Sequence, residues 1–226
     1  EKPILLWSPD SKKIATFQQD QRHVKDMYLV KTTVGAPELE QWKYPLPGDS
    51  AIIMINRVVI DIENSKLIRF KMPADARRST LCDDIACNGS LSDTYWSKDG
   101  SQVAFVSVSR DHKKSNLRVA NALTGDVRDV FEETVPTQYE SGQGDVNWKF
   151  LPASNEFIWY SERNNFGHLY LYDLTTGHLK NKITNGSFTI TRVIDVDEEK
   201  RTILFEACGS GSNPYYKNYY SINFNG

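Results

Sequence analysis

The tetrapeptide Trp7-Ser8-Pro9-Asp10 recurs as Trp96-Ser97-Lys98-Asp99, and an apolar segment follows each copy after a short polar turn. These segments are residues 14–17 and 103–106, and their β-branched and aromatic side chains are typical of strands. Position 96 lies 89 residues after position 7, which is about twice the roughly 40–50 residues of one propeller blade. The repeat therefore predicts stacked four-stranded units, with one further unit between the two copies.

The remaining apolar segments continue this pattern of short strands and tight turns. Residues 7–33 form the first predicted unit, and residues 52–72 form the second around a hairpin turn. Units that begin at Trp96, Trp148 and Val193 complete a series of five. No long segment has apolar residues at helical spacing. The sequence therefore predicts an all-β fold, a β-propeller fragment of roughly four to five four-stranded antiparallel blades spanning the whole chain.

The composition is that of an ordinary globular chain. Of its 226 residues, 39% are hydrophobic and 25% are charged, which argues against disorder. The net charge of −2 does not indicate a nucleic acid or an anionic membrane surface as a partner. No apolar run approaches the ~20 residues of a membrane span, and no secretory signal is present. The chain starts at Glu1 directly before the first motif, which we interpret as a cut end.

Cys82 and Cys87 lie close together in a segment rich in Asp, Asn, Gly and Ser. Two interpretations stay open for them: two unpaired thiols, or a local disulfide in an oxidising compartment. A zinc site needs about four ligands, and no second Cys/His pair stands at a matching spacing. We therefore predict no metal site.

Hydrolase machinery is not recognisable in the sequence. Residues 209–212 come nearest to a G-x-S-x-G nucleophile elbow and lack its spacing, and no glycine loop indicates a phosphate-bearing cofactor. His168 begins an apolar strand, which favours a structural hydrogen bond. Glu132 and Glu133 could bind an amine or act as acid and base, but their place at a strand end favours a solvated surface pair. We predict no catalytic residue and no cofactor in this chain.

Three motifs, in order along the chain, give the sequence a resemblance to a known family. They are Trp-Ser-Pro-Asp at 7–10, Tyr-Pro-Leu-Pro-Gly at 44–48, and Tyr-Ser-Glu-Arg at 160–163 leading to His-Leu-Tyr-Leu-Tyr-Asp at 168–173. Their identity and order resemble the propeller of the dipeptidyl-peptidase IV family, which belongs to the prolyl oligopeptidase group of serine peptidases. The resemblance covers essentially the whole chain.

The resemblance implies that residues 1–226 are the C-terminal part of an eight-bladed propeller, with a catalytic α/β-hydrolase domain expected downstream. The parent polypeptide would be a serine peptidase that removes dipeptides from the N-termini of peptides, favouring Pro or Ala in the second position. This chain alone would be inactive, and its role would be to gate and position peptide substrates. A secreted or periplasmic location is implied by the same resemblance.

The resemblance also bears on site residues. A loop from a later blade borders the substrate pocket in this family, and Glu140, Gln143 and Asp145 are the border residues that we predict here. The family's amine-binding glutamate pair precedes the Trp-Ser-Pro-Asp motif, where this chain has only Glu1. We do not assign that role to the carboxylate pair at 132–133.

The expected partners are peptide substrates, the downstream hydrolase domain and a second copy of the protein in a homodimer. An alternative function is a stand-alone binding propeller that presents loops to a protein or peptide. A third hypothesis, a complete five-bladed sugar-active enzyme, would need a carboxylate cluster on the central channel.

Overall fold

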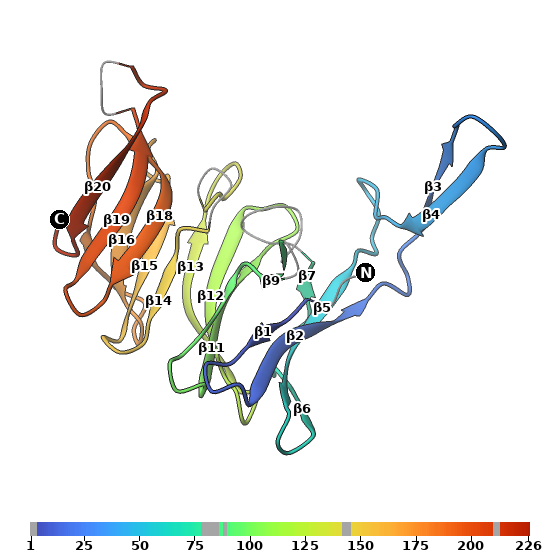
Figure 1. Ribbon diagram of the computed structural model, residues 1–226, viewed down its shortest axis with the longest axis horizontal. Coiled ribbons are helices and arrows are strands. Elements are labelled where there is room, and N and C mark those ends of the chain that lie inside the picture. The colour runs from blue at the N-terminus through green and yellow to red at the C-terminus, as the bar shows by residue number, and fades with distance from the viewer. Residues whose placement is uncertain (1–3, 78–85, 88–89, 142–145, 210–212) are drawn as a thin grey trace.

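The computed structural model describes residues 4–77, 86–87, 90–141, 146–209 and 213–226. Within these ranges the regular structure consists of twenty β-strands, and no helix occurs. Figure 1 shows the strands as a row of sheets along the longest axis, with one hairpin extending away from them. The predicted all-β fold is confirmed.

The first sheet contains the strands that surround the Trp-Ser-Pro-Asp motif. Its members are β1 (Leu6–Trp7), β2 (Lys13–Asp20), β5 (Met54–Asp61) and β6 (Lys66–Arg69), with the short β7 (Asp75–Ala76) paired to β5. β2 and β5 pair along their whole length, from Lys13 opposite Asp61 to Asp20 opposite Met54. The prediction of separate units at 7–33 and 52–72 is wrong, because this ladder joins both segments in one blade.

The strands β3 (Asp26–Lys31) and β4 (Glu38–Lys43) form a two-stranded hairpin inserted between β2 and β5. We call this hairpin the arm. Every residue of β4 except Lys43 is exposed, and Figure 1 shows the arm projecting beyond the blades at the upper right. The arm is therefore an insertion into the first blade and does not belong to the wall of sheets.

Two four-stranded sheets follow, and each adds its strands in chain order. The second sheet contains β10 (Thr94–Trp96), β11 (Gln102–Val108), β12 (Lys114–Asn121) and β13 (Val127–Thr134). The third sheet contains β14 (Lys149–Leu151), β15 (Glu156–Ser161), β16 (His168–Asp173) and β17 (Leu179–Lys182). These sheets confirm the predicted units that begin at Trp96 and Trp148. The strands β8 (Ala86–Cys87) and β9 (Ser90–Leu91) form a small separate ladder.

The last sheet has three strands, β18 (Thr189–Asp197), β19 (Thr202–Cys208) and β20 (Lys217–Asn223). The described part of the chain thus contains four blade sheets, which agrees with the prediction of roughly four to five. Antiparallel neighbours in chain order are the arrangement of propeller blades.

The repeated motif forms the same turn in both copies. The hydroxyl group of Ser8 donates to Asp10, and that of Ser97 donates to Asp99. Gly100 has a φ of 65°, in the left-handed region that glycine favours. The two copies also meet, because the indole Nε1 of Trp96 donates to the carbonyl oxygen of Leu6 at 3.1 Å. This bond connects the first sheet with the second.

The hydrophobic core lies between the sheets. Phe157 and Trp159 of β15 pack in a cluster shared with the second sheet, whereas Ile158 and Tyr160 pack in a cluster shared with the last sheet. Successive side chains of a strand point to opposite faces. A strand that is covered on both faces therefore has a continuous apolar sequence, as residues 157–160 do.

The connections between strands alternate between two rims, because neighbouring strands are antiparallel. The Trp-Ser turns and the turn between β5 and β6 lie on the rim at the bottom of Figure 1, which we call the lower rim. The arm, the β15–β16 tip and the connection from β13 to β14 lie on the opposite, upper rim.

Candidate functional site

The candidate site lies on the upper rim of the third blade, where the β13–β14 connection meets the β15–β16 tip. Its central residue is Glu133, near the end of β13. Glu133 faces the same side as Phe131, two positions earlier, and Phe131 packs into the core between the second and third sheets. The alternation of the strand therefore directs the Glu133 carboxylate into the protein.

Three side chains of β15 and its tip surround this carboxylate. The indole Nε1 of Trp159 donates to Glu133 Oε2 at 2.6 Å, and the Ser161 hydroxyl donates to Oε1 at 2.5 Å. Arg163 Nη2 lies 3.3 Å from Oε1. A buried carboxylate is costly unless it is paired and hydrogen-bonded, and here it is both. The interpretation of Glu132 and Glu133 as a solvated pair is wrong for Glu133, which is buried, and holds only for the exposed Glu132.

Arg163 connects this cluster to the surface of the rim. Its Nε donates to the Ser161 hydroxyl oxygen at 2.9 Å. Its guanidinium carbon lies 4.5 Å from the centre of the Tyr170 ring, a distance at which cation–π attraction is significant. Tyr170 in turn accepts a hydrogen bond from the Asn164 amide at 3.1 Å. These contacts hold the Arg163 side chain in one place at the edge of solvent.

The connection from β13 to β14 is fixed near both of its ends. The Tyr139 ring stacks on Trp159 at 5.5 Å, and its hydroxyl donates to the carbonyl oxygen of Tyr160 at 3.3 Å. Burial, with a smaller contribution from Glu133, raises the pKa of Tyr139 well above its ordinary value. Tyr139 is therefore a neutral donor at physiological pH.

Asn147 holds the other end of the connection. Its backbone N–H donates to the Ser141 hydroxyl oxygen at 3.0 Å. Its side chain donates to the carbonyl oxygen of Thr191 at 3.3 Å and accepts from the Val193 N–H at 2.6 Å. The segment that contains the predicted border residues thus starts and ends at positions bonded to the third and last sheets.

The structure places one of the three predicted border residues. Glu140 is half-buried on the upper rim, where its Oε1 accepts from the Gln138 amide at 2.9 Å. Gln143 and Asp145 lie outside the described residues. The nearby Tyr160 hydroxyl group donates to Glu162 Oε1 at 3.1 Å. Burial, followed by the charges of Glu162 and Glu140, raises the pKa of Tyr160.

The other sequence-based expectations have mixed outcomes. His168 is buried, and its ring nitrogens lie 3.1 Å from the Thr184 hydroxyl and 3.1 Å from the Gly186 carbonyl oxygen, which confirms the structural hydrogen bond. Cys82 lies outside the described residues, and the side chain of Cys87 is not described, so the disulfide stays a prediction. Among the residues that the structure describes, no group of three or more His, Cys, Asp or Glu side chains could hold a metal ion.

Sequence reasoning missed Glu133, Tyr139, Ser161 and Arg163 as a connected group. One signal was available, because Glu133 continues the inward alternation of Phe131 in β13. The partners on β15 and its tip could not be identified locally, since they belong to a different sheet. The described ranges contain no helix long and apolar enough to cross a membrane.

Comparison with known proteins identifies the family of the whole chain. Residues 1–226 match the family described as the dipeptidyl peptidase IV N-terminal region. A Bacteroides ovatus structure assigned to dipeptidyl aminopeptidase IV is similar at 20% identity and a TM-score of 0.75, covering 97% of this chain and 31% of that protein. Porphyromonas gingivalis dipeptidyl peptidase 4 is similar at 19% identity and a TM-score of 0.75, covering 97% of this chain and 29% of that protein. The chain thus spans about a third of these proteins, and it belongs to the dipeptidyl peptidase IV N-terminal region family.

Proposed function

We propose that this chain is the non-catalytic propeller portion of a dipeptidyl-peptidase-IV-like serine exopeptidase. The observation that carries the proposal is the family match over all 226 residues, in a chain that spans only about a third of its structural relatives. The remaining length of the parent polypeptide would include the α/β-hydrolase domain with its Ser-His-Asp triad. In this proposal the parent is an exported enzyme, and the propeller by itself is inactive.

The propeller's task in this enzyme is to limit access and to position peptides beside the hydrolase domain. The upper rim supports this role, because its loops are held by buried contacts while acceptor groups remain at the surface. Glu162 accepts from the Tyr160 hydroxyl group, and the charge of Glu140 acts on the same group. Carboxylates accept hydrogen bonds from peptide N–H groups. Glu140, Gln143 and Asp145 are the residues that we assign to the pocket border.

Glu133 has a different task from the family's amine-binding glutamates. Its two oxygens already bind Trp159, Ser161 and Arg163 in the interior. Because both oxygens are already bonded inside the protein, this carboxylate is not available to the ammonium group of a substrate. Glu133 therefore supports the rim, and the amine-binding pair would have to come from elsewhere in the parent polypeptide.

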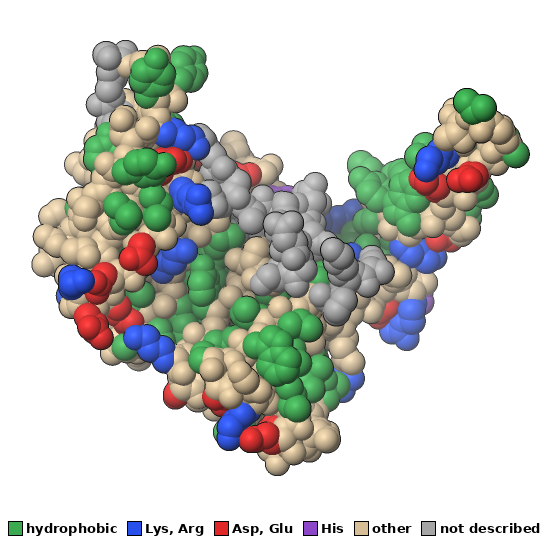
Figure 2. All heavy atoms as spheres, in the orientation of Figure 1, with side chains coloured by type: hydrophobic (Ala, Val, Ile, Leu, Met, Phe, Trp, Pro, Cys, Tyr) green, Lys and Arg blue, Asp and Glu red, His purple; other side chains and the backbone are tan. Residues whose placement is uncertain are grey.

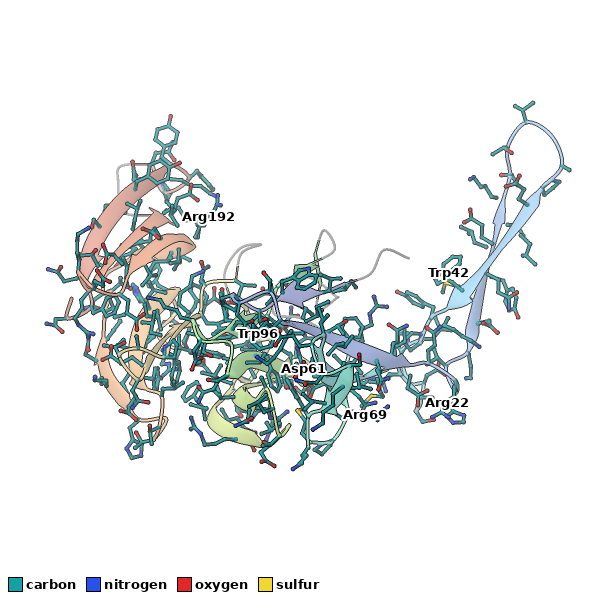
Figure 3. All side chains as sticks on the ribbon, turned by 60° about the horizontal axis from the view of Figure 1, so that its bottom comes forward. Arg22, Trp42, Asp61, Arg69, Trp96 and Arg192 are labelled. Carbon is teal, nitrogen blue, oxygen red and sulfur yellow. The ribbon has the colours of Figure 1, made fainter. Side chains whose placement is uncertain are left out.

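A homodimer is part of the proposal, and the arm is the element that we assign to its interface. Figure 2 shows apolar side chains at the tip and base of the arm, and Figure 3 shows Trp42 on the arm, away from Trp96 among the blades. A two-stranded hairpin is only marginally stable by itself. The arm carries the cross-strand ion pairs Lys31–Glu40 and Asp26–Lys43, so its surface has charges of both signs. A two-fold dimer uses the same patch on both copies, so each arm would meet charges of both signs on the other arm.

The test of the proposed function compares two proteins, the full-length polypeptide and residues 1–226. We expect the full-length protein to release a chromophore from Ala-Pro-p-nitroanilide and to lose this activity after treatment with a serine-directed organophosphate. Residues 1–226 should release none. A full-length polypeptide that binds peptides without cleaving them would instead favour the stand-alone binding propeller.

A further inference from the structure

A polar cavity lies away from the upper rim, on the first strands of three neighbouring sheets. Its volume is about 470 Å³, within the roughly 300–1,000 Å³ typical of ligand sites. Tyr95 of β10, Phe150 of β14 and Ile194 of β18 all line it. Each of these three strands is an edge strand of its sheet, so the cavity lies along one shared edge of the three blades.

The position of its charged residues follows from the blade repeat. Each first strand leads into a turn on the lower rim. Lys98 is the third residue of the Trp-Ser-Lys-Asp turn after β10, and Glu198 and Glu199 occupy the corresponding turn after β18. Both turns border the same cavity, because the blades stand side by side. Residues 100 positions apart are thereby brought to one site.

The apolar part of the lining is rigid. Tyr95 packs edge-on against Trp148 with 4.7 Å between ring centres, and its hydroxyl donates to the Trp148 carbonyl oxygen at 3.4 Å. Burial, with a smaller effect from the charge of Asp93, raises the pKa of Tyr95 to about 12. The Lys149 ammonium group lies 3.4 Å from the Tyr95 hydroxyl and 5.7 Å from its ring centre. Tyr95 thus helps to set the place of one of the two lysines.

The positively and the negatively charged side chains that line this cavity belong to different sheets. The cations Lys98 and Lys149 belong to the second and third sheets, whereas the lining carboxylates come from the last sheet and its turn: Asp195, Asp197, Glu198 and Glu199.

Two of these carboxylates already have partners. Glu198 accepts from the backbone N–H of Ser154 at 2.9 Å, and Asp197 pairs with Lys200 at 2.9 Å. Asp195 and Glu199 are exposed, and neither forms an ion pair within 4 Å among the described residues, although the charge of Asp195 contributes to the raised pKa of Lys200. Lys98 is likewise exposed and unpaired within the described ranges. The cavity therefore offers an ammonium group on one side and two carboxylates on the other.

We propose that this cavity binds a short peptide with both termini charged. The peptide's ammonium group would lie against Asp195 and Glu199, its carboxylate against Lys98, and its side chains against Tyr95. This inference rests on the proposed function, because the dipeptide released by a dipeptidyl peptidase is such a zwitterion. The cavity then holds the reaction product on the side of the propeller away from the upper rim.

The experiment measures binding of radiolabelled Ala-Pro to the full-length protein by equilibrium dialysis. The catalytic serine is first blocked with an organophosphate, so that the catalytic centre does not contribute. We expect one bound peptide per chain. N-acetyl-Ala-Pro and Ala-Pro-amide each lack one terminal charge and should bind at least 10-fold more weakly.

Variants assign the binding to this cavity. Lys98→Ala and the double change Asp195→Asn with Glu199→Gln alter exposed side chains, and both should weaken Ala-Pro binding at least 10-fold. Lys66→Ala is the matched control, because Lys66 is an exposed lysine at the start of β6, next to a lower-rim turn of the first sheet. It should bind as the unchanged protein does. Thermal unfolding of each variant establishes that the fold is retained.

The outcomes separate this inference from the proposed function. If the charged and the blocked peptides bind equally well, or if the cavity variants bind Ala-Pro as the unchanged protein does, the proposal that this cavity binds a peptide with two charged termini is overturned. Hydrolysis of Ala-Pro-p-nitroanilide by the untreated protein is measured in parallel. Activity without cavity binding leaves the proposed function standing and rejects the site, whereas cavity binding without activity rejects the peptidase and leaves a peptide-binding propeller.

Discussion

The guanidinium group of Arg57 lies 2.7 Å from the carboxylate of Asp93, and this buried pair joins the first sheet to the second. Arg57 also contacts Asp75 at 3.1 Å and lies over the Phe105 ring at 4.6 Å. The carboxylate of Asp93 accepts two hydrogen bonds from Arg57 and a third from the Thr94 hydroxyl. The donors and acceptors of the pair are therefore used within the protein, as burial of charge requires.

Removal of Arg57 should destabilise the protein strongly. Arg57→Met leaves the Asp93 carboxylate buried without its cation, a change that typically costs about 3–5 kcal/mol. Urea unfolding at pH 7 measures the loss. Lys71→Met is the control, because the Lys71–Asp126 pair is exposed and such pairs contribute little. If both substitutions shift the unfolding midpoint equally, the Arg57–Asp93 pair does not hold the two sheets together.

The acid stability of the protein should depend on Glu156. Burial of this side chain raises its pKa, but hydrogen bonds from Arg201, Lys180 and Ser154 outweigh burial and leave the pKa below its ordinary value. A carboxyl group with a lowered pKa in the folded state stabilises the protein above its unfolded pKa of about 4.3, and this stability is lost as the pH falls through the folded pKa.

Glu156→Gln should therefore flatten the decline in unfolding free energy between pH 5 and pH 3, measured by urea unfolding at a series of pH values. Glu199→Gln changes an exposed carboxylate of the neighbouring turn and should leave the decline as it is. An unchanged decline in the Glu156 variant would show that other carboxylates control acid unfolding.

Removal of the Glu133 carboxylate should loosen the upper rim. Glu133→Ala leaves the Trp159 indole and the Ser161 hydroxyl without their acceptor, which typically costs about 1–3 kcal/mol. Hydrogen exchange should be faster at the backbone amides of Tyr139 and Asn147, while exchange in the last sheet changes less. In the full-length enzyme we expect a higher KM for peptides. Glu132→Gln is the control, and comparable exchange in both variants would contradict the supporting role of Glu133.

The pH dependence of stability near neutrality should depend on His168. Burial, followed by the charge of Lys182, lowers its pKa. Since the folded protein prefers the neutral ring, its contribution to stability is present above the unfolded pKa of about 6.5 and is lost as the pH falls through the folded pKa. His168→Gln should reduce the difference in thermal midpoint between pH 7.5 and pH 5. His178→Gln changes an exposed ring, and an equal effect there would refute the assignment.

The arm should be required for dimer formation by the full-length protein. Leu29→Lys and Leu39→Lys place charges on exposed apolar positions of β3 and β4, and we expect sedimentation velocity to show monomers for the double variant. Leu123→Lys alters an exposed leucine in the turn between β12 and β13 and should leave the dimer intact. A dimer that survives the arm substitutions would exclude the arm, and a monomeric unchanged protein would exclude the homodimer.

The blade pattern could be predicted from the sequence because its signals are local. The Ser8 and Ser97 hydroxyl groups bond within their own turns, and the apolar run at 157–160 reflects a strand covered on both faces. The boundaries of the first blade could not be predicted in this way. β2 pairs with β5 across the inserted arm. The alternation of polar and apolar residues within a strand does not show which distant strand it pairs with.

The candidate site, too, was predictable from the sequence only in part. The order and identity of the sequence motifs determined the family, and the family resemblance predicted Glu140 and its neighbours as residues of the pocket border. Only the tertiary structure decided that Glu133 is buried while Glu132 is exposed, and that Lys98 shares a cavity with Asp195. Strands and turns are encoded by neighbours in the chain, whereas the partner of an inward side chain depends on which sheet packs against it.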